Sequence, residues 1–267
     1  MGERKGSPPP GGDGEGTVPD PIAPRSATTD AVRERLIDEA YRMITADGAG
    51  AVTVRRLAAA AGVSTMAVYT RFGSVGAVTG AVCERGFDEF ADLMESVSRS
   101  DDPVADLQLL GLTYLAFATA HPHLYTLMFQ YTSPDWDAAR RSDLMSAGRP
   151  TDSPAGRRAF AAMMRALERV GGADARGDAG GVGAATPAEH LLQAGETWSA
   201  VHGLAMLSIA GHLRGAHDAV AESLLVTLAV GHGADRVAAQ ASLAAAQRRL
   251  AATEAAISPG DRAPSGT

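Results

Sequence analysis

The sequence comprises 267 residues, of which 45% are hydrophobic and 21% are charged, an ordinary composition for a globular protein. Its formal net charge is -7, and it holds one cysteine, Cys83, which excludes an intramolecular disulfide framework and fits a reducing compartment. No apolar run approaches the roughly 18 residues that a membrane-spanning helix needs, so we expect a cytoplasmic protein that does not cross a membrane.

The chain opens with residues 1–27, which are dense in proline and glycine and poor in large apolar side chains. Such a segment cannot bury enough surface to offset its ordering entropy, so we expect a flexible arm. Thr29 or Asp30 then offers an N-cap for a first helix that ends near Asp47. Its apolar residues recur at four-residue spacing, which indicates an amphipathic helix: Val32, Leu36, Ala40 and Ile44.

Two short helices with a three-residue turn between them are predicted next. Thr53 can cap a helix that runs to Ala61, and Gly62 supplies the left-handed conformation that ends it. Ser64 caps a second helix that reaches Phe72. Two helices joined by a glycine-containing turn form a helix-turn-helix, whose second helix can lie in the DNA major groove.

The local charge of this segment differs from that of the whole chain. No acidic residue stands between Asp47 and Glu84, although the chain carries 31 acidic and 24 basic residues. The same stretch contains Arg55, Arg56 and Arg71. A surface that faces a polyanion must be free of carboxylates, so the pattern favours DNA binding. The alternative is that an alanine-rich segment lacks acids by chance.

The rest of the chain is predicted to be helical, with breaks at proline and glycine. The residue before Pro122 resists helical geometry, so a short apolar turn and a polar loop at 131–150 are expected there. A glycine-rich loop is expected near 171–185. One helix is expected to begin near Val75, and others to cover 104–121 and 154–170. A long helix is expected to start near Pro187. The last core helix carries Val220, Leu224 and Leu228 and ends at Gly231, and an alanine-rich helical stretch then runs to Ile257.

No β-strand alternation of any length is present, so the predicted fold class is all-α. We expect a three-helix helix-turn-helix domain followed by a helical bundle for dimerisation and ligand binding. The expected boundaries are a disordered arm at 1–27, the DNA-binding domain at 28–75, the bundle at 76–232, and an alanine-rich helix with a flexible tail at 233–267.

The stretch VRRLAAAAGVSTMAVYTRFGSVGAV resembles the DNA-binding domain of the TetR family, and the likeness extends over residues 29–90. The resemblance implies phosphate contacts at the start of the second helix and base contacts at the start of the third, with a tyrosine on a phosphate. The implied DNA-binding residues are Thr53, Arg55, Arg56, Ser64, Thr65, Met66, Ala67, Tyr69, Thr70 and Arg71. Val75 departs from the family, which often has a lysine there.

The second half carries a narrower resemblance. TWSAVHGLAML, together with HPHLYTLMF upstream, is similar to the TetR regulators named for a Trp-His-Gly signature, over residues 101–231. That resemblance implies a two-fold dimer and an effector pocket among long helices. We expect the last two core helices to form the dimer interface, because so apolar a helix pair would otherwise leave an exposed patch.

Aromatic and methionine side chains of the bundle are candidates for an apolar pocket, since methionines adapt to the shape of a ligand. At helical spacing, however, such residues form a core more often than a ligand site, and both interpretations stay open here. The candidate ligand-binding residues are Tyr114, Phe117, Tyr125, Met128, Phe129, Met163, Met164, Trp198 and His202.

No metalloprotease motif, cysteine pair or phosphate-binding loop is present, so no cofactor, metal or catalytic function is predicted. We expect a homodimeric repressor that binds double-stranded DNA at a palindromic operator and is released by a small apolar effector. The alternative is a helical ligand-binding or interaction module that has lost DNA binding, and Val75 is the residue that keeps this alternative open.

Overall fold

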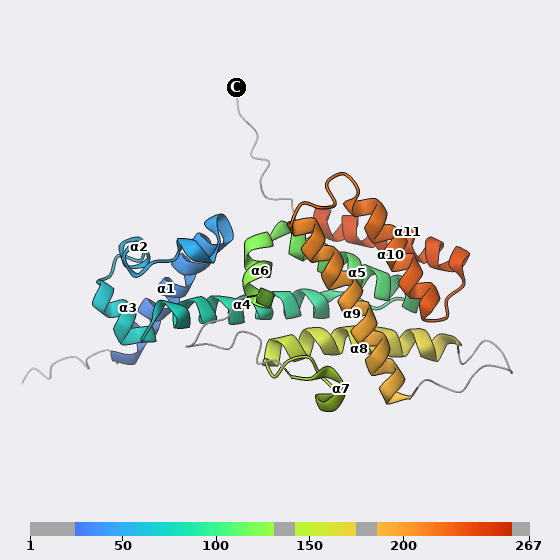
Figure 1. The fold of residues 1–267 in the computed structure, drawn as a ribbon, viewed down its shortest axis with the longest axis horizontal. Coiled ribbons are helices and arrows are strands. Elements are labelled where there is room, and N and C mark those ends of the chain that lie inside the picture. Colours follow the sequence, from blue (N-terminus) through green and yellow to red (C-terminus); the bar gives the residue numbers. More distant parts are fainter. Residues whose placement is uncertain (1–24, 131–141, 175–185, 258–267) are drawn as a thin grey trace, which may run out of the picture.

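The computed structural model describes residues 25–130, 142–174 and 186–257, and within these ranges every element is a helix. The predicted all-α class is confirmed. The molecule is elongated, with three helices at one end and a bundle at the other (Figure 1). Most of the predicted arm, the first part of the polar loop, most of the glycine-rich loop and the C-terminal tail lie outside the described residues.

The first end of the molecule, which we call the head, consists of α1 (Arg25–Asp47), a 3-10 turn (Ala49–Ala51), α2 (Val54–Ala60) and α3 (Thr65–Phe72). The predicted caps are confirmed: Thr53 accepts a hydrogen bond from the backbone of Arg56, and Ser64 accepts one from that of Ala67. Gly62 has a φ of 65°, the left-handed conformation expected of it. The predicted start of α1 at Thr29 or Asp30 is wrong, because the helix already begins at Arg25.

Helix α4 (Val75–Ser96) joins the head to the bundle in one continuous rod (Figure 1). Ser74 caps its first turn with a hydrogen bond of 3.1 Å from the backbone of Ala77. Val78 and Val82 are fully buried beside the head, and Phe87 and Phe90 are buried further along. One hydrophobic core therefore extends along α4 from the head into the bundle.

The bundle contains seven further described helices, at Pro103–Ala120 (α5), Pro122–Gln130 (α6), Leu144–Ala147 (α7), Pro154–Asp174 (α8), Pro187–Ile209 (α9), His217–Gly231 (α10) and Arg236–Ile257 (α11). The apolar turn predicted after Pro122 is wrong, since the chain forms α6 there. Proline is tolerated in the first turn of a helix, where its missing N–H has no partner to lose. Pro122 therefore ends one helix and starts the next.

The alanine-rich helix α11 is part of the bundle core. Ala239, Leu243 and Ala246 are buried, and α11 packs mainly along α5. The prediction that α10 is the last core helix is therefore wrong. Small side chains let two helix backbones approach closely, and this contact buries a helix that has little apolar surface of its own.

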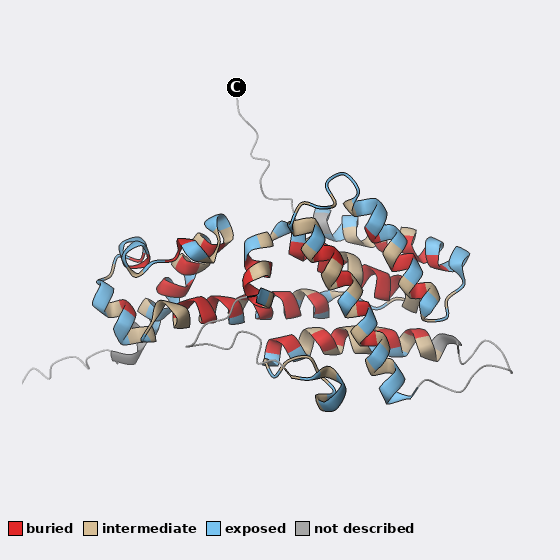
Figure 2. Cartoon of the chain, in the orientation of Figure 1, coloured by how far each residue is buried: buried red, intermediate tan, exposed pale blue. Residues whose placement is uncertain are grey.

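The apolar stripe predicted for α10 is also rotated from the true core face. Val220 is exposed and Leu224 is half-buried, whereas Ala221 and Leu225 are buried (Figure 2). The helix is apolar on more than one side, and periodicity alone does not tell which side meets the rest of the chain.

Candidate functional site

Exposed positions gather on α2 and α3 at the outer end of the head (Figure 2). Most of the candidate DNA-binding residues belong to these two helices. Thr65, Met66 and Tyr69 are exposed on α3, and Arg55 is exposed on α2. Among the described residues from Gly48 to Cys83, no side chain carries a negative charge. The exposed side chains that this segment contributes to the outer surface of the head therefore include arginines and no carboxylate.

The hydroxyl groups of this surface are largely engaged with the backbone. Thr53 and Ser64 serve as N-caps of α2 and α3. Thr70 donates its hydroxyl proton to the carbonyl oxygen of Met66, over 2.9 Å. These three residues define the ends and the rotation of the helices, which in turn decide where the neighbouring side chains point.

The arginines of the surface differ in how they are held. Arg55 is exposed, while Arg56 donates to the carbonyl oxygen of Ala51 over 3.0 Å and lies 3.5 Å from the carboxylate of Asp47. Arg71 is half-buried, and its Nε is buried without a hydrogen-bond partner among the described residues. To contact a phosphate, the terminal guanidinium nitrogens of Arg71 would have to extend from a side chain that is partly buried. Ala67 is half-buried as well.

The bundle contains a cavity of about 390 Å³ that is lined by residues of α4 to α10 and of the loop segments that flank α7. The structure brings six of the nine candidate ligand-binding side chains to its wall: Tyr114, Met128, Phe129, Met163, Trp198 and His202. Phe117, Tyr125 and Met164 do not line it. Phe117 and Tyr125 are buried in the core behind the wall, and Met164 packs against a second apolar cluster between α5, α8 and α9.

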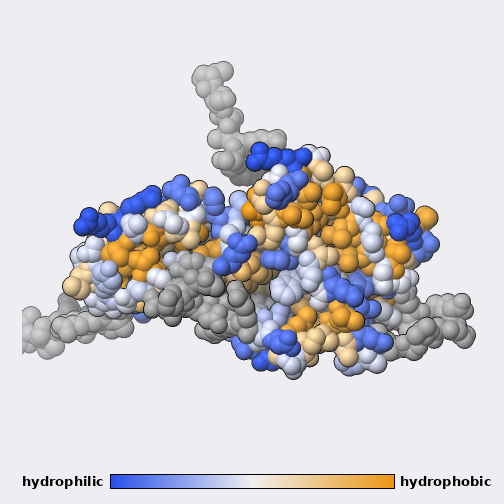
Figure 3. Space-filling view, in the orientation of Figure 1, coloured by the Kyte–Doolittle hydropathy of each residue, from blue (hydrophilic) through white to orange (hydrophobic). Residues whose placement is uncertain are grey.

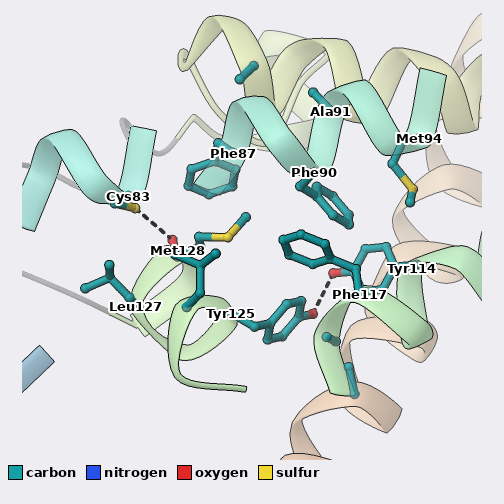
Figure 4. Packing of buried hydrophobic residues seen from close by; sticks show 14 of the residues in the cluster. Cys83, Phe87, Phe90, Ala91, Met94, Tyr114, Phe117, Tyr125, Leu127 and Met128 are labelled. Carbon is teal, nitrogen blue, oxygen red and sulfur yellow. Dashed lines mark hydrogen bonds between the residues drawn. The ribbon is translucent and has the colours of Figure 1, made fainter. Parts of the chain in front are cut away.

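Several cavity residues are missed by the sequence prediction. Phe87, Phe90 and Met94 of α4 line the cavity. Their spacing of three and four residues indicates only that they share a buried face, which the sequence assigns to an ordinary core. Figure 4 shows how Phe87 and Phe90 from α4 face the aromatic side chains of α5 and α6.

A hydrogen-bonded group of three side chains stands at the cavity. The hydroxyl oxygens of Tyr114 and Tyr125 are 2.7 Å apart (Figure 4), and that of Tyr125 lies 2.7 Å from Nδ1 of His202. Burial raises the pKa of Tyr114 to about 12 and lowers that of His202 below its ordinary value. The three groups are therefore neutral near pH 7 and satisfy one another.

Two further polar groups lie on the cavity wall. Thr197 is buried, with its hydroxyl oxygen 2.9 Å from Nε2 of His232. The amide nitrogen of Gln108 donates to the carbonyl oxygen of Ala239 in α11 over 3.1 Å, so the amide orientation is fixed. Its Oε1 is buried and accepts no hydrogen bond from the described residues. No acidic or basic side chain, histidine aside, lines the described wall.

In the part of the chain that the structure describes, no cluster of three or more histidine, cysteine or carboxylate side chains has a geometry that could hold a metal ion. No described helix is long and apolar enough to cross a membrane.

Two family models match the sequence. Residues 36–77 match the bacterial regulatory proteins of the tetR family, and residues 107–230 match a tetracyclin repressor-like C-terminal domain. The first match covers α2, α3 and most of α1, and the second runs from α5 to the end of α10. Helix α11 lies beyond both. Among curated proteins, none matches this sequence.

Solved structures share the fold over most of the chain. A protein of unknown function from Rhodococcus sp. RHA1 is 25% identical, with a TM-score of 0.57 over 75% of this chain and 94% of its own. SCO4313, described as a regulatory protein, is 21% identical, with a TM-score of 0.55 over 77% and 98%. RolR in complex with its ligand resorcinol is 15% identical, with a TM-score of 0.54 over 82% and 96%.

Proposed function

The chain belongs to the TetR family of DNA-binding transcriptional regulators, and from that premise we propose that it is a cytoplasmic, ligand-responsive repressor that binds a palindromic operator as a homodimer. The observation that carries the ligand response is the course of α4. Its first turn packs beside α3, and its last three turns supply Phe87, Phe90 and Met94 to the cavity wall.

A single helix that touches both sites can couple them. If an effector prefers a cavity in which α4 is tilted or shifted, its binding energy favours that position of the head. In a dimer, the two α3 helices must be about 34 Å apart to enter successive major grooves on one side of the DNA. A change in that distance lowers the affinity for DNA, and by linkage DNA lowers the affinity for the effector.

The side chains that line the cavity favour a neutral effector. Its lining is apolar apart from a few hydrogen-bonding groups, and His202 is neutral near pH 7. A charged ligand would lose its hydration without meeting an opposite charge. Gln108 adds a fixed acceptor that no donor of the described residues satisfies. We therefore propose a small, mostly apolar effector with at least one hydroxyl or N–H group.

The exposed apolar face of α9 and α10 is the observation that favours dimerisation. Leu192 and Leu207 on α9 and Val220 on α10 are exposed, and Figure 3 shows apolar side chains gathered over these two helices. Contiguous apolar patches on a monomer mark an interaction surface. We propose that this face pairs with its copy on a second chain.

DNA binding and its release by ligand can be tested in one assay. DNA that the purified protein selects from a random pool is labelled, and binding is followed by fluorescence anisotropy while small neutral compounds are added. Since RolR, a protein of the same fold, binds resorcinol, small phenols are the first compounds to test. A compound that releases the DNA, and that quenches the fluorescence of Trp198 in a Trp136→Phe variant, would support the proposal; the variant is needed because the chain holds two tryptophans.

A cavity-filling variant provides the control. Ala159 lines the cavity, and Ala159→Trp should keep DNA binding but lose its release by any active compound. Ala238 is exposed on α11, and Ala238→Trp should behave as the wild type. Release that persists unchanged in Ala159→Trp would show that the effector binds elsewhere.

A further inference from the structure

Met66 stands out on the head because an apolar side chain is held in water where base contacts are expected. It is 69% exposed and lies in the first turn of α3, two residues after the cap residue Ser64. In a helix-turn-helix, the N-terminal residues of the second helix are those that contact base edges. Packing among the described residues does not account for Met66.

The hydrogen-bonding groups around Met66 leave little for direct readout of base acceptors. Thr70, one turn along the same face, donates its proton to the carbonyl oxygen of Met66 itself. Arg71 lies in the last turn of the helix, and its Nε is buried. Within α3, Thr65 is the one other exposed side chain of the first turn, and no asparagine, glutamine or lysine occurs in the helix.

The chemistry of the major groove then selects the base. Thymine is the one base that presents a methyl group there, and apolar side chains recognise it by contact. A methionine thioether is polarisable and flexible enough to follow such a surface. We propose that Met66 contacts a thymine C5-methyl group in each operator half-site and is a specificity-determining residue of this protein. The proposal rests on the DNA binding assigned above.

The expected loss of DNA affinity follows from the apolar area that a thymine methyl group contributes to the contact. Removing one methyl group from an apolar contact should weaken binding roughly fourfold. A dimer makes the contact twice, so removing both thymine methyls should weaken it by roughly fifteenfold. Both effects are within the range of an equilibrium binding measurement.

Replacing thymine by uracil tests the contact directly, because the two bases differ only in that methyl group and pair identically. The protein selects its site from a random DNA pool, and each thymine of the selected site is then replaced singly and in symmetric pairs by deoxyuridine. Wild-type protein should lose affinity at one thymine per half-site. Met66→Ala should bind the thymine and uracil forms of that site equally, whereas Met66→Leu should keep the preference.

The controls separate this contact from general DNA binding. Tyr69→Phe should weaken binding to all sites but retain the full uracil penalty. Because Met66 is exposed, Met66→Ala should unfold at the same urea concentration as the wild type. Equal wild-type affinity for every thymine and uracil pair, or a uracil penalty that persists in Met66→Ala, would overturn the proposal. Failure to select any DNA would instead overturn the proposed function.

Discussion

The head and the bundle hold their polar groups in opposite ways. In the head, Thr53, Ser64 and Thr70 bond to backbone groups three or four residues away in the sequence. In the bundle, Gln108 bonds to a residue 131 positions away, and Asp106 to one 143 positions away. The helix-turn-helix of α2 and α3 is thus specified by local signals, whereas these bundle contacts exist only once the chain has folded.

The difference matches what each region has to do. The head must present a fixed outward surface, so its polar side chains define helix ends and leave the remaining positions free for DNA. The bundle must hold a cavity open against the tendency of apolar side chains to fill space. Polar groups that hydrogen-bond from one helix to another, such as Tyr114, Tyr125 and His202, stiffen the wall of the cavity.

Asp106→Ala is expected to have the largest effect and to show how much the bundle depends on distant contacts. The buried carboxylate of Asp106 is paired with Arg169 of α8 and with Arg249 of α11, the latter over 2.6 Å. Breaking such a pair costs about 3 kcal/mol of unfolding free energy. Ser64→Ala, which removes a local cap from the head, should cost about 1 kcal/mol.

Urea unfolding of the two full-length variants measures this contrast. The comparison between head and bundle would be broken if Ser64→Ala destabilised the protein as much as Asp106→Ala.

The same carboxylate gives the bundle a pH dependence. Burial raises the pKa of Asp106, but hydrogen bonds from Ser100, Arg169 and Arg249 outweigh it and hold the pKa below its usual value. Its stabilisation is therefore present above the unfolded-state pKa of about 3.9 and is lost as the pH falls through the folded-state value. Asp106→Asn should accordingly be less stable than the wild type at pH 7, with a difference that shrinks below about pH 4.

A charge on the exposed face of α9 and α10 is expected to have the next largest effect. An unpaired carboxylate in an apolar interface costs several kcal/mol, so Leu207→Glu with Val220→Glu should weaken the dimer by at least about 2 kcal/mol. Sedimentation equilibrium measures the change. Val237→Glu on α11, where the wild-type side chain is 73% exposed, is the matched control and should leave the dimer intact.

In the head, Tyr69→Ala combined with Arg71→Ala should weaken DNA binding about tenfold and reduce the slope of log affinity against log salt by about 2, because each subunit loses the one phosphate charge that Arg71 neutralises and Tyr69 carries no charge. Anisotropy at several salt concentrations measures both quantities. Arg248 is an exposed residue of α11, far from the head in sequence. Arg248→Ala should therefore change neither the affinity nor the slope. An unchanged slope in the double variant would mean that Arg71 does not contact a phosphate, and an unchanged affinity would mean that neither residue does.

Val75→Lys should give the smallest effect, and in the opposite direction. Val75 is half-buried at the first position of α4, where the family often has a lysine. A lysine there should add one phosphate contact per subunit, tighten binding about threefold and steepen the salt slope by about 2. Val75→Met, similar in volume and uncharged, should bind as the wild type does. No gain with lysine would place this position out of reach of the DNA.

The DNA-binding surface was more predictable from the sequence than the cavity, because only local signals can be recognised in a sequence. The helix boundaries of the head follow from Thr53, Gly62 and Ser64, whose effects reach only a few residues. The candidate cavity residues could be predicted only as apolar positions at helical spacing. Met128 lines the cavity while Phe117 lies behind it, and nothing in their spacing distinguishes the two.

The sequence by itself determined the all-α class, the caps of the helix-turn-helix and the acid-free surface of α3, because capping, glycine conformation and net charge are properties of short segments. Only the tertiary structure decided that α11 belongs to the core, that α4 borders the cavity, and that Gln108 is held by Ala239. Those facts depend on which faces of many apolar helices meet, and an apolar stripe gives its periodicity without naming its partner.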